Sequence, residues 1–199
     1  MIIEAHPITV NGLTYTIRSA SEEDAEQLSN VRLQIDGETE NLDREPGEAF
    51  LDPAAFAELI RTDSEKPRNL LLVASVEDRI VGFSRCEGIY LKRLSHKVEF
   101  GVGVLQEFWG YGIGKHLLQA SIDWADTNGI AKISLNVLAT NEKAIRLYQR
   151  LGFEREGVLK RDKMLSDGKF YDTVVMGRFR ADGLTDSPAL AMSENRHLP

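Results

Sequence analysis

The chain has 199 residues, of which 42% are hydrophobic and 28% are charged, proportions typical of a globular protein rather than a disordered chain. The formal net charge of −7, without a strongly basic stretch, disfavours nucleic acid as the main partner. The longest apolar run, residues 70–74, is far too short to cross a bilayer, and the first residues lack the pattern of a signal peptide. We therefore expect no membrane association. The only cysteine, Cys86, excludes an internal disulfide and fits a reducing, cytoplasmic location.

The first part of the chain predicts a strand followed by two helices. Apolar and polar residues alternate over residues 13–20, which indicates a strand. A capping pattern at Ser21, followed by apolar residues at helical spacing, predicts a helix that ends near Ile35. The acidic segment 36–50 is interrupted by Gly and Pro, and it predicts a loop. Residues 52–62 read as a helix, with an aspartate cap and a proline at its first position.

The middle of the chain predicts three strands. Residues 69–76 and 79–91 are β-rich runs separated by a short polar turn, so they predict a hairpin. Residues 96–104 predict a further strand that contains Gly101 and Gly103. Glycines inside a strand indicate a bulge or the close approach of another backbone.

The last part predicts two helices, a strand between them, and a hairpin. The helix after a glycine-rich loop ends at Asn-Gly, residues 128–129. A buried strand follows over 132–139, and then a helix over 141–152. Strands over 153–165 and 169–179 are joined through Ser-Asp-Gly, a hairpin turn signal.

These elements predict one α/β domain over residues 1–180 with a mixed sheet, followed by a flexible, polar tail over 181–199. The central strand–helix–strand–helix unit predicts a parallel pair of strands joined by a right-handed crossover. The remaining neighbours are connected as hairpins, and hairpin strands are antiparallel.

The stretch "WGYGIGKHLL", residues 109–118, places three glycines directly before a helix. Glycines let a backbone approach a ligand closely, and the start of a helix offers free N–H groups and a positive dipole end that suit a phosphate. The stretch does not match a P-loop, because Trp109 stands where the first glycine belongs and His116 replaces the metal-binding hydroxyl. It does not match the dinucleotide fingerprint either, because Lys115 or Leu117 stands where the third glycine belongs.

Three stretches occur in order: "VEFGVGVLQEFWGYGIGKHLL", "LNVLATNEKAIRLYQRLGF" and "EREGVLKRDKMLSDGKFYDTVVM". Together they resemble the GNAT superfamily of N-acetyltransferases, within it the bacterial branch that carries N-x-x-A-I-x-L-Y-x-x-x-G-F-x-x-E-G. The resemblance covers roughly residues 13–180. It implies the GNAT fold, a mostly antiparallel sheet with a splayed parallel pair, flanked by about four helices. It also implies acetyl-CoA as the cosubstrate and a direct transfer without an acyl-enzyme.

The resemblance assigns the binding of acetyl-CoA to the glycine loop and the splayed strand. Trp109 stands at the family's Gln/Arg position, which removes a side-chain contact but leaves the backbone donors. The pantetheine arm is expected to lie beside Val102 and Val104, and Asn141 either bonds this arm or caps its helix. The backbone N–H groups expected to hold the pyrophosphate are those of Gly110, Tyr111, Gly112, Ile113, Gly114 and Lys115.

Two residues are candidates for the acid–base chemistry. By resemblance, Glu99 acts through water as general base, and the alternative is a solvent-facing or ion-paired strand residue. Tyr148 matches the tyrosine that reaches the sulfur of CoA as general acid, and the alternative is a packed aromatic residue. His96 could share the role of base but is more typical of a structural histidine, and Cys86 is expected to be a core residue. The sequence contains no cluster with metal-ligand spacing.

The sequence says less about which residues bind the acceptor of the acetyl group. Phe170 and Asp172 match the family's G-x-[YF]-x-D pattern and could line the acceptor pocket or stabilise the hairpin. The acidic loop could attract a cationic amine such as a polyamine, or it is a solvated face. Its carboxylates are Asp36, Glu38, Glu40, Asp43, Glu45 and Glu48, against Arg44.

Three functions remain open at this point. The first is acetylation of a small-molecule primary amine, the second is acetylation of a protein N-terminus as in the ribosomal-protein enzymes, and the third is an acyl-CoA-binding module without turnover. A homodimer is a further possibility that only the analogy with relatives supports.

Overall fold

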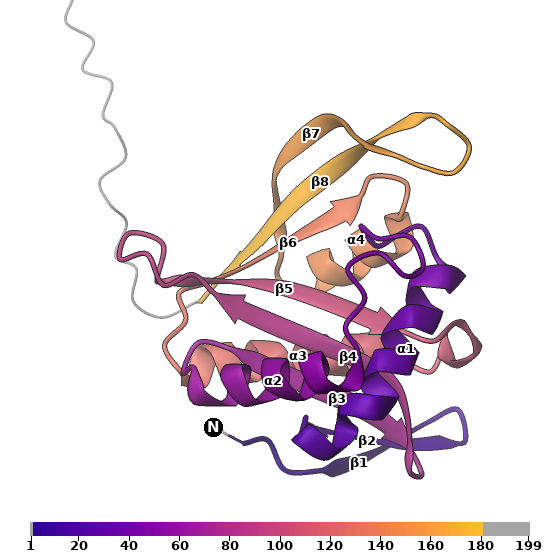
Figure 1. Ribbon diagram of the computed structural model, residues 1–199. Helices are drawn as coiled ribbons and strands as arrows, with labels where there is room; N and C mark the ends of the chain where they lie inside the picture. Colours follow the sequence, from indigo (N-terminus) through magenta and orange to yellow (C-terminus); the bar gives the residue numbers. More distant parts are fainter. Residues whose placement is uncertain (1, 181–199) are drawn as a thin grey trace, which may run out of the picture.

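The computed structural model describes residues 2–180, and the tail expected over 181–199 lies outside the described residues. One sheet contains eight strands in the order β1-β2-β3-β4-β5-β6-β8-β7, and four α-helices pack around it in the described part of the chain (Figure 1). This arrangement confirms the predicted mixed α/β sheet. The elements are β1 (His6–Val10), β2 (Leu13–Ser19), α1 (Ala25–Glu38), α2 (Pro53–Glu65), β3 (Leu70–Val76), β4 (Arg79–Gly88), β5 (Lys97–Val104), α3 (Ile113–Thr127), β6 (Lys132–Leu138), α4 (Glu142–Arg150), β7 (Glu154–Met164) and β8 (Phe170–Phe179).

All neighbouring strands are antiparallel except β5 and β6, which form the predicted parallel pair. Their pairing covers only Lys97–Glu99 on β5 and Lys132–Ser134 on β6. Beyond these residues the two strands diverge, as Figure 1 shows. The divergence of β5 and β6 therefore begins where their short pairing ends.

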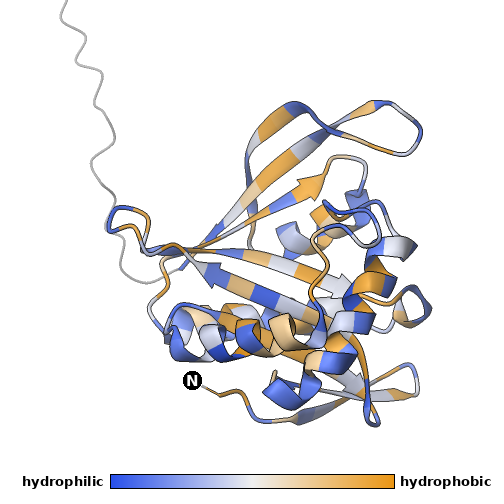
Figure 2. Ribbon diagram, viewed as in Figure 1, coloured by the Kyte–Doolittle hydropathy of each residue, from blue (hydrophilic) through white to orange (hydrophobic). Residues whose placement is uncertain are grey.

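Helices cover both faces of the diverging strands. A Cβ placed on Gly103 would lie 3.2 Å from Ile35 of α1, whereas a Cβ on Gly114 of α3 would lie 3.8 Å from Val104. Because successive strand residues point to opposite faces, α1 and α3 lie on opposite faces of β5. Figure 2 shows hydrophobic residues along the central strands between these layers. No helix within residues 2–180 is long and apolar enough to span a membrane.

Strand β1 was not predicted, and it pairs with β2 through a two-residue turn at Asn11 and Gly12. Both turn residues have positive φ, 51° and 80°, which is the conformation of a type I′ hairpin turn. Asn-Gly is the preferred sequence for that turn, so the signal was present in the sequence.

The predicted end of the first helix was wrong. Helix α1 continues beyond Ile35 to Glu38, so Asp36 and Glu38 are helical rather than part of a loop. Asp36 is buried, and its carboxylate accepts hydrogen bonds from Arg44 Nε at 3.0 Å and Arg44 Nη2 at 2.9 Å. The following segment folds back and neutralises a charge that sequence patterns place in solvent.

Strand β4 ends at Gly88, three residues before the predicted end. The Gly88 N–H donates to Asn69 Oδ1 at 3.0 Å, and Asn69 Nδ2 donates to Asp63 at 2.6 Å. Asp63 also accepts from Arg85 Nε at 2.6 Å and Nη2 at 3.0 Å. This network links α2 to the C-terminal end of β4. The Asp63 side chain at its centre is only 2% exposed.

We predict that Asp63→Ala lowers the free energy of unfolding by about 3–5 kcal/mol, because it leaves Arg85 and Asn69 without their buried partner. Urea denaturation would measure the change. Glu58→Ala on the same helix is the control, since the exposed Glu58–Arg61 pair should contribute at most about 1 kcal/mol. Equal losses in the two variants would contradict the importance of the network.

Candidate active site

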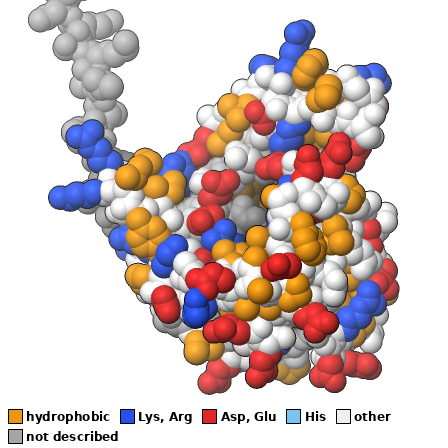
Figure 3. Space-filling model, viewed as in Figure 1, with side chains coloured by type: hydrophobic (Ala, Val, Ile, Leu, Met, Phe, Trp, Pro, Cys, Tyr) orange, Lys and Arg blue, Asp and Glu red, His pale blue; other side chains and the backbone are white. Residues whose placement is uncertain are grey.

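A cleft of about 790 Å³ opens where β5 and β6 separate. Its walls come from α1, α2, β4, β5, β6, α4 and the glycine loop. Figure 3 shows the surface hollowed below the β7–β8 hairpin, with acidic and basic side chains around the opening. All predicted site residues except Tyr111 line this cleft: Glu99, Val102, Val104, Trp109, Gly110, Gly112, Ile113, Gly114, Lys115, Asn141 and Tyr148.

The glycine loop presents a row of unused backbone donors. Within the described part of the chain, no group accepts a hydrogen bond from the N–H of any residue from Gly110 to Lys115. Gly110 and Gly112 have φ of 92° and 79°, values that favour glycine, and α3 starts directly after them. Free N–H groups at the start of a fifteen-residue helix suit a phosphate-type anion.

Side chains from elsewhere hold this loop in place. The Trp109 indole N–H donates to the Val104 carbonyl at 2.8 Å, which joins the loop to the end of β5. The Tyr15 hydroxyl lies 3.1 Å from the Tyr111 carbonyl and 2.5 Å from His116 Nδ1. Burial, together with the charge of Lys115, lowers the pKa of His116 and favours the neutral ring. Sequence patterns did not reveal Tyr15, because it lies on β2, far from the loop in sequence.

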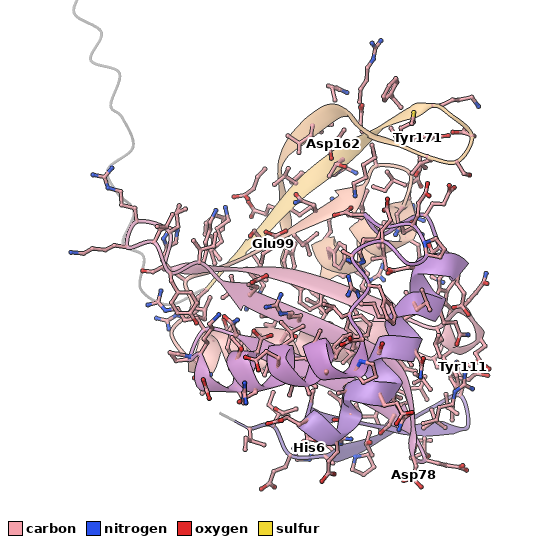
Figure 4. All side chains as sticks on the ribbon, viewed as in Figure 1. His6, Asp78, Glu99, Tyr111, Asp162 and Tyr171 are labelled. Carbon is pink, nitrogen blue, oxygen red and sulfur yellow. The ribbon has the colours of Figure 1, made fainter. Side chains whose placement is uncertain are left out.

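These contacts bear on two of the predicted residues. The Val104 carbonyl accepts from the Trp109 indole, which uses one of its two lone pairs. Tyr111 does not line the cleft, and Figure 4 shows it on the outer side of the molecule, away from Glu99. The Tyr111 carbonyl instead accepts a hydrogen bond from the Tyr15 hydroxyl.

Gly101 leaves one face of β5 open, whereas Gly103 lets Ile35 of α1 approach the strand closely. A Cβ on Gly101 would meet nothing within 4 Å, so side-chain volume is missing there. The pairing of β5 with β6 has already stopped at Glu99, which leaves backbone groups of β5 facing the gap. An extended ligand could take the place of a neighbouring strand in this gap.

Helix α4 brings two predicted residues to the cleft. The Asn141 side chain accepts from the Ala144 N–H at 3.2 Å and therefore acts as the helix cap. Tyr148 packs beside Phe153 with 5.9 Å between ring centroids, and its hydroxyl has no hydrogen-bond partner within residues 2–180. Burial raises the pKa of Tyr148 to about 12, so the phenol is protonated at neutral pH.

Glu99 lies on β5 directly opposite Glu87 of β4, and both side chains are exposed in the cleft. Glu87 accepts from Arg85 Nη1 at 2.8 Å, whereas Glu99 has no partner in the described structure. Like charges on directly opposite strand residues are destabilising. A free carboxylate kept at this position in a cleft suits the binding of an ammonium group or the removal of a proton. Figure 4 shows Glu99 where the strands begin to separate.

Four other residues considered from the sequence lie outside the cleft. The His96 carbonyl bonds the N–H groups of Ala131 and Lys132. Cys86 is fully buried, and burial raises the pKa of its thiol to about 12, which makes it a poor nucleophile. Phe170 is 63% exposed. Asp172 accepts from Lys160 Nζ at 2.7 Å, so it stabilises the β7–β8 hairpin.

The acidic segment is not a free anionic cluster. In addition to Asp36 with Arg44, Glu38 accepts from the Gln106 N–H at 2.6 Å and Glu40 from the Ser166 N–H at 2.8 Å. Asp43 pairs with Lys163 of β7. These carboxylates attach the segment to the glycine-loop side and to the β7–β8 hairpin, and their contacts weaken the expectation that the segment attracts a polyamine. Among residues 2–180, no group of three or more His, Cys, Asp or Glu side chains could hold a metal ion.

Residues 36–153 match the model of the acetyltransferase (GNAT) family. The chain therefore belongs to this family and is an acetyltransferase.

Two curated relatives show different acceptors. The L-amino acid N-acetyltransferase AaaT of Escherichia coli is 29% identical over 118 residues, which cover 59% of this chain and 72% of the relative. The [ribosomal protein bS18]-alanine N-acetyltransferase of Salmonella typhimurium is 30% identical over 109 residues, which cover 55% of this chain and 70% of the relative.

Solved structures share the fold. An acetyltransferase of the GNAT family from Streptococcus pneumoniae has a TM-score of 0.80 at 26% identity and covers 83% of this chain and 99% of its own. The protein yncA from Salmonella typhimurium, solved with acetyl-CoA, has a TM-score of 0.76 at 19% identity and covers 88% of this chain and 99% of its own.

We predict that Gly112→Ala weakens the binding of coenzyme A about tenfold, because a side chain at positive φ costs about 1–2 kcal/mol and displaces the loop donors. Isothermal titration calorimetry would measure the dissociation constant. Gly12→Ala is the matched control, since Gly12 has φ of 80° with open space around it but lies in the β1–β2 turn. It should lose similar stability and retain affinity, and a loss of affinity in both variants would contradict a role of the loop in binding.

Proposed function

We propose that the protein transfers the acetyl group of acetyl-CoA directly to the primary amine of a small molecule. One observation carries this proposal: a single cleft, within residues 2–180, is lined by glycine-loop residues whose N–H groups have no acceptor, by the open gap between β5 and β6, by a carboxylate without a partner at Glu99 and by a protonated phenol at Tyr148. Each feature suits one part of the reaction.

The donor site would hold two parts of acetyl-CoA. The N–H groups from Gly110 to Lys115 would bind the pyrophosphate, with each charge-assisted hydrogen bond contributing about 1.5–3 kcal/mol. The pantetheine arm would lie along β5 at Val102, in the gap that β6 leaves open. Acetyl-CoA supplies the acetyl group as a thioester. A backbone N–H of β5 near Gly101 would bind the carbonyl oxygen of that thioester as negative charge develops.

Glu99 would move the proton of the acceptor. An alkyl ammonium has a pKa of about 10.4, so its deprotonation at pH 7 costs roughly 4–5 kcal/mol. The Glu99 carboxylate would accept this proton, directly or through one water, while the amine nitrogen bonds to the acetyl carbon. The absence of a partner for Glu99 in the described residues leaves its oxygens available for this step.

Tyr148 would supply the second proton. As the carbon–sulfur bond breaks, the phenol would donate its proton to the sulfur of the departing thiolate. Burial holds the pKa of Tyr148 near 12, which keeps the donor protonated across the working range of pH.

A protein N-terminus is the second candidate acceptor, and the similarity to the bS18-alanine acetyltransferase supports it. Release of thiol from acetyl-CoA, measured with amino acids, polyamines and N-terminal peptides, separates the two. Binding of acetyl-CoA without release for every acceptor would instead favour a non-catalytic binding module.

We predict that Tyr148→Phe lowers kcat about 100-fold and leaves the KM for acetyl-CoA unchanged, because only the proton donor is lost. Steady-state thiol release would measure both. The wild-type rate should not decline as the pH approaches 10, the ordinary pKa of a phenol, since burial raises the pKa of Tyr148 to about 12. A Tyr148→Phe enzyme with normal kcat would exclude this role.

We predict that Glu99→Gln lowers kcat/KM for the amine about 100-fold at neutral pH. The rate should recover as the pH rises toward the pKa of the amine, because a free amine needs no base. Glu87→Gln is the matched comparison, since Glu87 lies opposite Glu99 but is paired with Arg85. If the two variants lost activity equally and with the same pH profile, Glu99 would not be the base.

A further inference from the structure

Arg32 of α1 is a cation in the cleft without a counterion. Its side chain lines the cleft, and it makes no hydrogen bond or ion pair with any residue that the structure describes. Its Nη1 atom is also shielded from solvent, which leaves a buried donor unsatisfied. Such a donor normally costs free energy, so a guanidinium in this state that also lines a cleft suits an anionic ligand.

The neighbouring carboxylates do not supply an anionic partner for Arg32. Glu48 lines a small pocket with Arg32, but within residues 2–180 it accepts from the Glu45 N–H and makes no bond to Arg32. Asp36 is the adjacent carboxylate, but Arg44 binds both of its oxygens in a bidentate pair. Burial and the positive charge of Arg44 lower the pKa of Arg32, and Asp36 only partly opposes this. The three side chains therefore carry an excess positive charge at the end of the cleft formed by α1. Asp43, which also lines the cleft, is paired with Lys163.

Arg32 and Glu99 lie on the same side of the sheet. Ile35 packs against Gly103, and Arg32 precedes Ile35 by three residues, so both share one face of α1. Glu99, Gly101 and Gly103 share one face of β5, because strand residues alternate. Glu99 and Gly103 are separated by about 13 Å along the strand, at about 3.3 Å per residue. Arg32 and Glu99 both line the cleft, so a small molecule bound between their side chains can bridge the remaining distance.

We propose that the acceptor carries a carboxylate as well as its primary amine, and that Arg32 binds this carboxylate. The inference rests on the proposed acetyltransferase function and specifies its substrate class: amino acids in the broad sense, with the amine near Glu99 and the carboxylate at Arg32. Arginine suits this role because its planar guanidinium binds carboxylates in a fixed geometry. Bound carboxylate would neutralise the excess positive charge beside Arg44.

The test compares acceptors in pairs that differ only by the carboxylate: phenylalanine with phenethylamine, and 6-aminohexanoate with hexylamine. Thiol release from acetyl-CoA is measured with the full chain. We expect the carboxylate-bearing member of at least one pair to have the higher kcat/KM, by about tenfold to 100-fold, as for a charge-assisted hydrogen bond. The amine and the carboxylate are closer together in phenylalanine than in 6-aminohexanoate. The pair with the larger preference for its carboxylate-bearing member therefore shows which separation fits the cleft.

Arg32→Gln should abolish that preference. The KM for the carboxylate-bearing acceptor should rise by the same factor, with kcat, the KM for acetyl-CoA and turnover of the carboxylate-free amine little changed. Arg32→Lys should retain part of the preference because it keeps the charge. Arg68→Gln is the matched control, since Arg68 also has a buried Nη1 without a partner but lies outside the cleft. It should not alter acceptor selectivity, and thermal melting verifies the fold of each variant.

Equal turnover of both members of every pair by the wild type would overturn the inference while leaving the acetyltransferase function intact. Unchanged selectivity in a folded Arg32→Gln enzyme would also overturn it. If coenzyme A binds but no amine in either class releases thiol, the proposed function fails, and this inference fails with it.

Discussion

The short parallel contact between β5 and β6 is the constraint on which the cleft depends. The two strands pair over only three residues each, and their backbones then separate. The glycine loop follows the free end of β5, and α4 follows the free end of β6. A longer ladder would close the gap and bring these two segments together. The divergence therefore creates the volume for a ligand and leaves the glycine loop and Tyr148 lining the same cleft.

Some of the charged side chains in the cleft are neutralised by pairs within the protein. Arg85 is held by Asp63 and Glu87, and Arg44 is held by Asp36. Glu99 and Arg32 have no partner in the described residues and carry opposite charges on the same side of the sheet, whereas the other cleft-lining cations without a partner there, Lys115, Lys143 and Arg150, lie on α3 and α4. Unpaired charges are costly in a partly buried site, so their persistence suits a ligand with the complementary pattern. A zwitterionic acceptor has this pattern, whereas a polyamine would leave Arg32 unsatisfied.

Features that depend on neighbouring residues could be predicted from the sequence. The Asp52 cap, the cap at Asn141 and the glycine loop before α3 are examples, since each is determined by residues within one turn. The resemblance to the GNAT family extended this local pattern to Glu99 and Tyr148. The prediction was less successful at 36–50, where acidic residues are typical of a solvated loop. Their partners, such as Ser166 for Glu40, lie more than a hundred residues away.

By itself, the sequence indicated the strands and helices apart from β1, and it singled out the glycine-rich stretch before α3 as a candidate site for a phosphate-type anion. Hydrogen bonding over short distances along the chain, and the period of apolar residues, are sufficient for both. Only the tertiary structure decided which charges are paired. Arg44 neutralises Asp36 and leaves Arg32 unpaired, and Tyr15 supports a loop that lies 96 residues further along the chain. Such contacts depend on how the elements pack, because pairing requires proximity in space rather than in sequence.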